Sequence, residues 1–136
     1  MVPECRDAGD AGEWLRRARS NFARAAADPA HPDILLEGLC FDAQQAAEKA
    51  IKAVLVHRRI RFPKTHAIAD LLSLAAENGV QIPPDVLVAT DLTTHAVETR
   101  YPGVSESVTR EEWIEAVAIA NRVLRWAQAI IEPSGN

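Results

Sequence analysis

The segment from Asp33 to Arg59 constrains the fold of this chain more than any other. At about 100° per residue, one broad face of a helix over this segment is apolar and rich in alanine, which lets a neighbouring helix approach closely. A second stripe on its flank mixes apolar and polar residues: Phe41, Gln44, Glu48 and Leu55. A helix that is apolar on more than one side is central in a bundle or buried in an oligomer. Because Gln and Glu are rarely buried without partners, the second stripe favours an interface or a cleft.

Four further helices are predicted from capping signals and apolar spacing. The first runs from a capping box at Asp10–Glu13 to about Asp28, and Asp33 is expected to cap the central helix. Thr65 is expected to cap a third helix that ends at Asn78-Gly79. A fourth, opened by Pro83-Pro84, has Val86, Leu87 and Leu92 facing inward and ends near Tyr101, before Pro102. A second capping box, Thr109–Glu112, opens the fifth.

These elements predict an all-α fold, a four- to five-helix up-and-down bundle with short connections. All 136 residues fit one domain, with residues 1–10 and 133–136 loose at its ends. No run approaches the roughly 18 apolar residues of a membrane span, and no signal pattern opens the chain. Two cysteines and four scattered histidines offer neither a disulfide framework nor the spacing of a metal site. We therefore expect a cytoplasmic protein with no metal, no cofactor and no membrane partner.

The distribution of charge is uneven, although the formal net charge is only −4. Residues 49–66 contain six Lys or Arg and no Asp or Glu, whereas the rest of the chain has nine basic and nineteen acidic residues. The net charge argues against a protein that coats DNA generally. The basic run has two interpretations. It is either a solvated helix end, where cations complement the helix dipole, or the binding site of an anionic ligand.

Three groups of residues could bind such a ligand. In the first group, Gln44, Glu48 and Lys52 lie along one side of the central helix, beside Lys49. One interpretation is that Glu48 and Lys52 only form an ion pair. The other is that the glutamine amides bind the edge of a base and the lysines bind phosphate. Arg100 and Tyr101 precede Pro102, where an Arg fork beside a ring suits a phosphate next to a stacked base. Alternatively, Tyr101 closes the bundle end and Arg100 caps carbonyls. In the third group, Lys64 and His66 lie in the loop just before the third helix. They either help the helix start to bind an anion, or His66 is only a capping or surface residue.

The residues alone identify no catalytic set. There is no Gly-rich phosphate loop, no His-Glu-x-x-His motif, and no Ser or Cys nucleophile with an evident base. The three tryptophans, Trp14, Trp113 and Trp126, fall within predicted helices and are assigned to the core rather than to a ligand platform.

Three segments together resemble the HEPN family, in its small stand-alone prokaryotic branch. They are residues 40–49 (CFDAQQAAEK), 62–66 (FPKTH) and 98–103 (ETRYPG), and the likeness spans roughly Trp14 to Ala129. The resemblance implies a helical bundle, commonly a homodimer, with a cleft between helices. It also implies a partner, a minimal nucleotidyltransferase, in a toxin–antitoxin-type pair. In such pairs the HEPN member is either a ribonuclease toxin or a companion that binds a nucleotide or substrate.

The ribonuclease members of the family carry an Arg, four to six residues, and then a His at the start of a late helix. Arg100 stands where that Arg is expected, but residues 105–107 are Ser-Glu-Ser, so the histidine is missing. With twelve arginines and four histidines, about one match is expected by chance. Three pairs have the spacing of this motif, but they lie in loops or at other helix ends and are discounted: Arg61 to His66, Arg59 to His66, and Arg24 to His31.

Three hypotheses follow for the function. The first is a companion of the nucleotidyltransferase that binds a nucleotide through Gln44, Lys49, Lys52, Arg100 and Tyr101. The second is a metal-independent ribonuclease toxin that uses Arg100 with His66 or His95. The third is a non-catalytic dimeric interaction module that sequesters its partner.

Overall fold

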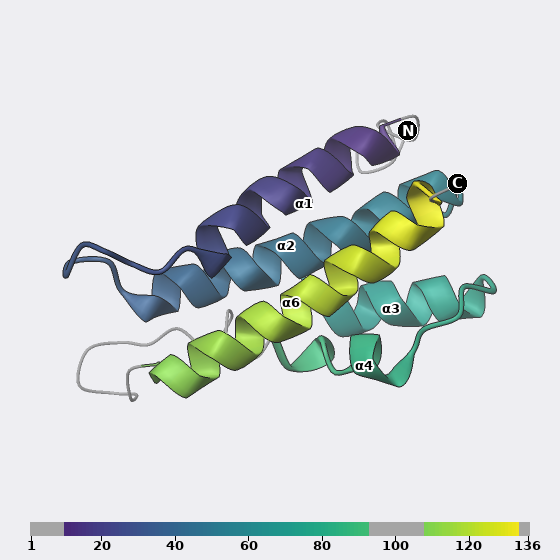
Figure 1. Cartoon of the computed structure of the whole chain (residues 1–136). Helices are drawn as coiled ribbons and strands as arrows, with labels where there is room; N and C mark the ends of the chain where they lie inside the picture. Colours follow the sequence, from purple (N-terminus) through teal and green to yellow (C-terminus); the bar gives the residue numbers. More distant parts are fainter. Residues whose placement is uncertain (1–9, 93–107, 134–136) are drawn as a thin grey trace.

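The computed structural model describes residues 10–92 and 108–133, and these residues contain helices and no strand (Figure 1). The helices are α1 (Ala11–Ala26), α2 (Leu36–His57), α3 (Ile68–Glu77), α4 (Pro84–Leu87) and α6 (Arg110–Ile131). The predicted all-α bundle is confirmed. None of the described helices is long and apolar enough to cross a membrane.

The central position predicted for the second helix is confirmed. Helix α2 packs against α1 and α6, and α3 lies along the same bundle (Figure 1). Five of its alanines are fully buried, and their small side chains allow the neighbouring helices to approach: Ala43, Ala46, Ala47, Ala50 and Ala53. The flank stripe is buried as well at Gln44, Glu48 and Leu55, whereas Phe41 keeps half its surface exposed.

The helix starts agree with the sequence only in part. The capping box of α6 is present, with the Thr109 hydroxyl accepting from the Glu112 amide and the Glu112 carboxylate accepting from the Thr109 amide. The capping box at Asp10 is wrong, because Glu13 instead accepts hydrogen bonds from Arg16 and Arg17.

Two other predicted caps are also wrong. Helix α2 begins at Leu36, with Leu35 as its N-cap, because the Asp33 amide donates to His31 Nδ1 in a separate turn. The Thr65 hydroxyl accepts from the Ala67 amide only two residues on, so α3 starts at Ile68. In both cases the polar side chain or its amide is used in a local turn before the helix.

The predicted fourth helix is interrupted. Helix α4 ends at Leu87, a turn follows at residues 88–89, and residues 90–92, the last described before residue 108, are helical again. Val86 and Leu92 are buried as predicted, but Leu87 is 52% exposed, because the turn breaks the continuous helical spacing assumed for it. The predicted end at Tyr101 lies outside the described residues. Helix α6 holds this region through Arg122 Nε, which donates to the Asp85 carbonyl, and Trp126 Nε1, which donates to the Gln81 carbonyl.

Helices α2 and α3 end in the same hydrogen-bond pattern. The Ile60 amide donates to the Leu55 carbonyl at 2.9 Å, and the Val80 amide to the Ala75 carbonyl at 3.0 Å. In both helix ends, the residue just before the donor must adopt the left-handed backbone conformation. That residue is Gly79 (φ 90°) after α3, as the predicted stop required, but it is Arg59 (φ 60°) after α2. A side chain is thus held where glycine is favoured.

Exchanging the residue types at these two positions should move stability in opposite directions. We expect Arg59→Gly to raise the free energy of unfolding by about 0.5–1 kcal/mol, and Gly79→Ala to lower it by about 1 kcal/mol or more. Urea denaturation of the two variants measures this difference. A loss of stability in Arg59→Gly would show that the Arg59 side chain stabilises the fold by more than its backbone conformation costs.

Candidate anion-binding site

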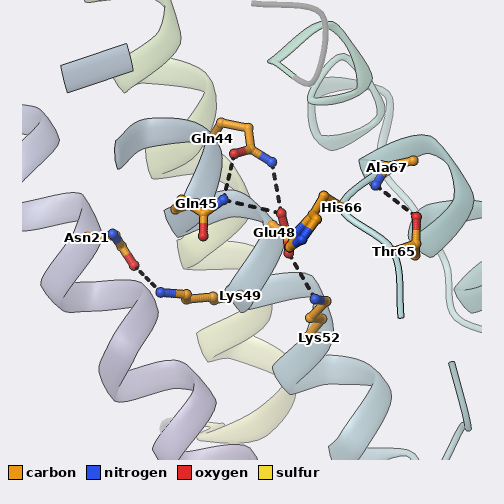
Figure 2. Close-up of polar contacts among 9 residues, drawn as sticks. All are labelled: Asn21, Gln44, Gln45, Glu48, Lys49, Lys52, Thr65, His66 and Ala67. Carbon is orange, nitrogen blue, oxygen red and sulfur yellow. Dashed lines mark hydrogen bonds and ion pairs between the residues drawn. The ribbon is translucent and has the colours of Figure 1, made fainter. Parts of the chain in front are cut away.

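A buried carboxylate, Glu48, organises the polar side chains in the middle of α2 (Figure 2). Its Oε1 atom accepts a hydrogen bond from Gln44 Nε2 at 2.9 Å. Its Oε2 atom contacts Lys52 Nζ at 2.8 Å and His66 Nδ1 at 3.0 Å. Gln45 Nε2 donates to the Gln44 side-chain oxygen at 2.8 Å, which completes the network. The loop before α3 therefore folds back along α2 until His66 meets Glu48.

The protonation of this network follows from its contacts. Burial alone would raise the pKa of Glu48, but the hydrogen bond and charge of Lys52, with hydrogen bonds from His66 and Gln44, lower it below its ordinary value. The carboxylate is therefore ionised at neutral pH and can only accept hydrogen bonds. His66 Nδ1 must then carry the proton. Because the His66 side chain is 73% exposed, its second ring nitrogen, Nε2, remains available for a ligand.

Lys52 is committed to the protein. It is buried, forms an ion pair with Glu48, and its ammonium lies 5.6 Å from the centre of the Trp14 ring and 5.8 Å from that of Phe62. The Glu48–Lys52 ion pair, one of the two interpretations of this spacing, is thus present, and both side chains are buried. Its role is to fix the carboxylate that orients His66.

Lys49 belongs to a different environment. Figure 2 shows it reaching Asn21 of α1 on one side of α2, with His66 on the other. Its ammonium donates to Asn21 Oδ1 at 2.8 Å, and the Asn21 amide donates to Asp42 Oδ1 at 3.0 Å. Burial lowers the pKa of Lys49, and the nearby cations Arg17 and Arg24 lower it further.

The loop between α2 and α3 exposes a group of cations, Arg58, Arg59, Arg61 and Lys64, which we call the basic loop. None of the four forms an ion pair with a carboxylate among residues 10–92 and 108–133. The arginines of α1 differ, since Arg16 and Arg17 both pair with Glu13. Phe62, buried in the core, anchors the loop. The loop thus presents positive charge that has no ion-pair partner in the described part of the chain, and it runs on to His66.

The HEPN domain family matches residues 11–130 of this chain. The chain belongs to the HEPN family. It is 31% identical to TT1696 from Thermus thermophilus, whose crystal structure aligns with a TM-score of 0.74 over 88% of this chain and 97% of that one. ST0689, an archaeal HEPN homologue, is 29% identical and aligns with a TM-score of 0.70 over 90% of this chain and 98% of that one. No curated protein matches the chain.

Within this HEPN fold, two of the three motifs that carried the family resemblance meet at the Glu48–His66 contact. Of the predicted ligand residues, Gln44, Glu48, Lys52 and His66 come together, Lys49 faces α1, and Lys64 is exposed on the basic loop. Arg100 and Tyr101 lie outside the described residues.

Sequence reasoning missed the partners that the HEPN bundle supplies from α1. Asn21 is buried, with 5% of its surface exposed, and its position three residues after Ala18 and four before Ala25 places it on the apolar face of α1. That spacing was a usable signal, because a polar residue on an apolar helix face requires a partner. Trp14 and Phe62, which enclose Lys52, carried no such signal.

Proposed function

We propose that this HEPN protein binds the phosphate groups of a nucleotide or RNA through its basic loop and His66. We further propose that it acts in the cytoplasm as a homodimeric companion of a minimal nucleotidyltransferase, in a toxin–antitoxin-type pair. The observation that carries the phosphate-binding proposal is the basic loop itself: its four exposed cations have no ion-pair partner among residues 10–92 and 108–133, and the loop runs on to His66, which Glu48 orients. Guanidinium forks and ammonium groups are the usual phosphate ligands, and His66 Nε2 can donate a hydrogen bond to phosphate when both ring nitrogens carry a proton.

The partner and the dimer rest on membership of the HEPN family rather than on contacts of this chain. Exposed apolar side chains near the first turns of two helices support the dimer, and these two helices, α2 and α6, begin at the same end of the bundle (Figure 1): Ile34, Leu35, Phe41 and Ile114. Apolar groups exposed together are typical of interfaces.

Calorimetric titration with ATP, GTP and a short single-stranded RNA tests the phosphate-binding proposal. For RNA, we expect the logarithm of the affinity to fall linearly with the logarithm of salt concentration, with a slope of about −0.7 per phosphate contact. Lys64→Gln and Arg61→Gln should each weaken binding and reduce the size of that slope by about one contact. Arg16→Gln, which removes an exposed cation already paired with Glu13, is the matched control. Absence of binding to all three ligands by folded protein would contradict the proposal.

The geometry of His66 also favours a second candidate, a metal-independent ribonuclease. A carboxylate-oriented imidazole with one free nitrogen can accept a proton from a ribose 2′-hydroxyl. Gel analysis of the RNA from the same titrations decides between binding and cleavage. A ribonuclease would release products in the presence of EDTA, and His66→Gln would stop the cleavage while RNA still binds. Intact RNA with the wild-type protein would remove this candidate.

A further inference from the structure

His66 and His31 are both exposed histidines, but their contacts fix the two neutral rings in opposite tautomers. The His66 Nδ1 atom lies 3.0 Å from Glu48 Oε2, and the ionised carboxylate requires a proton on that nitrogen, which leaves a lone pair on Nε2. In His31 the Nδ1 atom instead accepts from the Asp33 amide at 3.1 Å, so the proton lies on Nε2. The His66 and His31 side chains are 73% and 67% exposed, so access to solvent does not distinguish them. Of these two rings, only that of His66 presents a lone pair to solvent.

The lone pair of His66 is available to a reactant. No residue among 10–92 and 108–133 forms a hydrogen bond with the Nε2 atom. The Glu48 carboxylate strengthens Nε2 as a nucleophile, because it balances the positive charge that the ring gains when Nε2 forms a new bond. Gln44 and Lys52 hold the two oxygens of this carboxylate and so fix its orientation (Figure 2).

The charge near His66 selects the kind of electrophile. Arg61 and Lys64 precede His66 in the basic loop, and neither forms an ion pair with a carboxylate in the described part of the chain. Exposed cations without counter-ions attract an anionic reactant. A phosphoryl donor is both anionic and electrophilic, and the group that it transfers would form charge-assisted hydrogen bonds with the same cations.

We propose that His66 Nε2 is a phosphorylation site that takes its phosphoryl group from a phosphoramidate. The Nε2 lone pair forms a new N–P bond while the P–N bond of the donor breaks. The donor nitrogen, protonated before transfer, keeps the electron pair of the broken bond and leaves as a neutral amine. The proton on His66 Nδ1 stays in its hydrogen bond to Glu48. The proposal rests on the Glu48–His66 contact and does not require the basic loop to bind nucleotide or RNA.

Incubation of the full chain with potassium phosphoramidate at mildly alkaline pH tests this site. Mass spectrometry of peptides kept at alkaline pH, where phosphohistidine survives, gives the labelling rate of each histidine. In the folded protein we expect His66 to react about tenfold or more faster than His31, which must first lose its hydrogen bond from Asp33. In urea the two rates should agree within about threefold, because neither tautomer is fixed any longer. His66→Gln should remove the fast label and leave the labelling of His31 unchanged.

The position of the phosphoryl group on the ring provides a second measurement. NMR of the labelled protein should show the Nε2 isomer at His66, because Nδ1 is engaged by Glu48. A third measurement uses the charge of the loop. Lys64→Gln should slow the labelling of His66 by about twofold or more, whereas Arg16→Gln, which removes a cation already paired with Glu13, should leave it unchanged.

Three results would overturn the proposal: His66 reacts no faster than His31, the label lies on Nδ1, or Lys64→Gln and Arg16→Gln react at the same rate. RNA binding that responds to Lys64→Gln alongside any of these results would leave the basic-loop proposal standing and remove only this one. Fast Nε2 labelling of a protein that binds neither RNA nor nucleotides would support this site and remove the basic-loop proposal.

Discussion

Glu48→Gln should lower the free energy of unfolding by about 3–5 kcal/mol, a large share of the roughly 5–15 kcal/mol that stabilises a domain. The substitution keeps the size of the side chain but leaves Lys52 as a buried ammonium without a counter-ion. It also replaces one of the two carboxylate oxygens by an NH2 donor, so that either Gln44 or the pair Lys52 and His66 loses its acceptor. Urea denaturation followed by circular dichroism measures the loss.

A second substitution measures how much the ion pair itself contributes to stability, apart from the other hydrogen bonds of Glu48. Lys52→Met removes the other charge, and the double variant Glu48→Gln/Lys52→Met then has no unpaired buried charge. We expect the double variant to be more stable than the sum of the two single losses predicts, by about 0.5–3 kcal/mol. Additive losses would show that Glu48 and Lys52 do not stabilise one another.

The stability that Glu48 contributes should depend on pH in a definite direction. The pKa of Glu48 is lowered in the folded state, so its contribution is complete above the ordinary value of 4.5 and is lost as the pH falls through the lowered folded value. The difference between the wild type and Glu48→Gln should therefore be constant near neutral pH and shrink below about pH 4.5. A difference that grows on acidification would contradict the assigned direction.

The arrangement of the side chains around Glu48 was predictable from the sequence only where helical spacing determines it. Helical spacing placed Gln44, Glu48 and Lys52 on one side of α2, and the same spacing turns Lys49 about 100° away, towards α1. The loop was not predictable in this way. His66 lies eighteen residues after Glu48, and the return of the loop along α2 depends on the burial of Phe62, a tertiary contact.

Capping shows the same division. Thr109 and Glu112 form their predicted box, with both hydrogen bonds made inside one turn. Asp10 and Glu13 have the same spacing, but two arginines in the next turn bind Glu13. A motif that takes its partners from one turn is predictable only when the following turn offers no stronger partner.

Trp113→Ala should lower the free energy of unfolding by about 3–5 kcal/mol. The ring is buried at the start of α6, and its Nε1 donates to the Ala25 carbonyl at 2.8 Å. That carbonyl lies in the last turn of α1, where no later helical amide can satisfy it. The substitution therefore empties a large core position and leaves a buried acceptor without its partner. The assignment of this tryptophan to the core is confirmed.

Phenylalanine substitutions at two tryptophans of α6 isolate the hydrogen-bond part of that loss. Trp113→Phe keeps most of the packing and should cost about 1–3 kcal/mol, since a buried carbonyl loses its donor. Trp126 also donates to a backbone carbonyl, that of Gln81 at 3.3 Å, but it is partly exposed, so water can replace the bond. Trp126→Phe should therefore cost less than about 1 kcal/mol. Equal losses at the two positions would refute the role assigned to burial. Neither variant should change RNA affinity at low denaturant, because both indole hydrogen bonds go to backbone carbonyls away from the basic loop and His66.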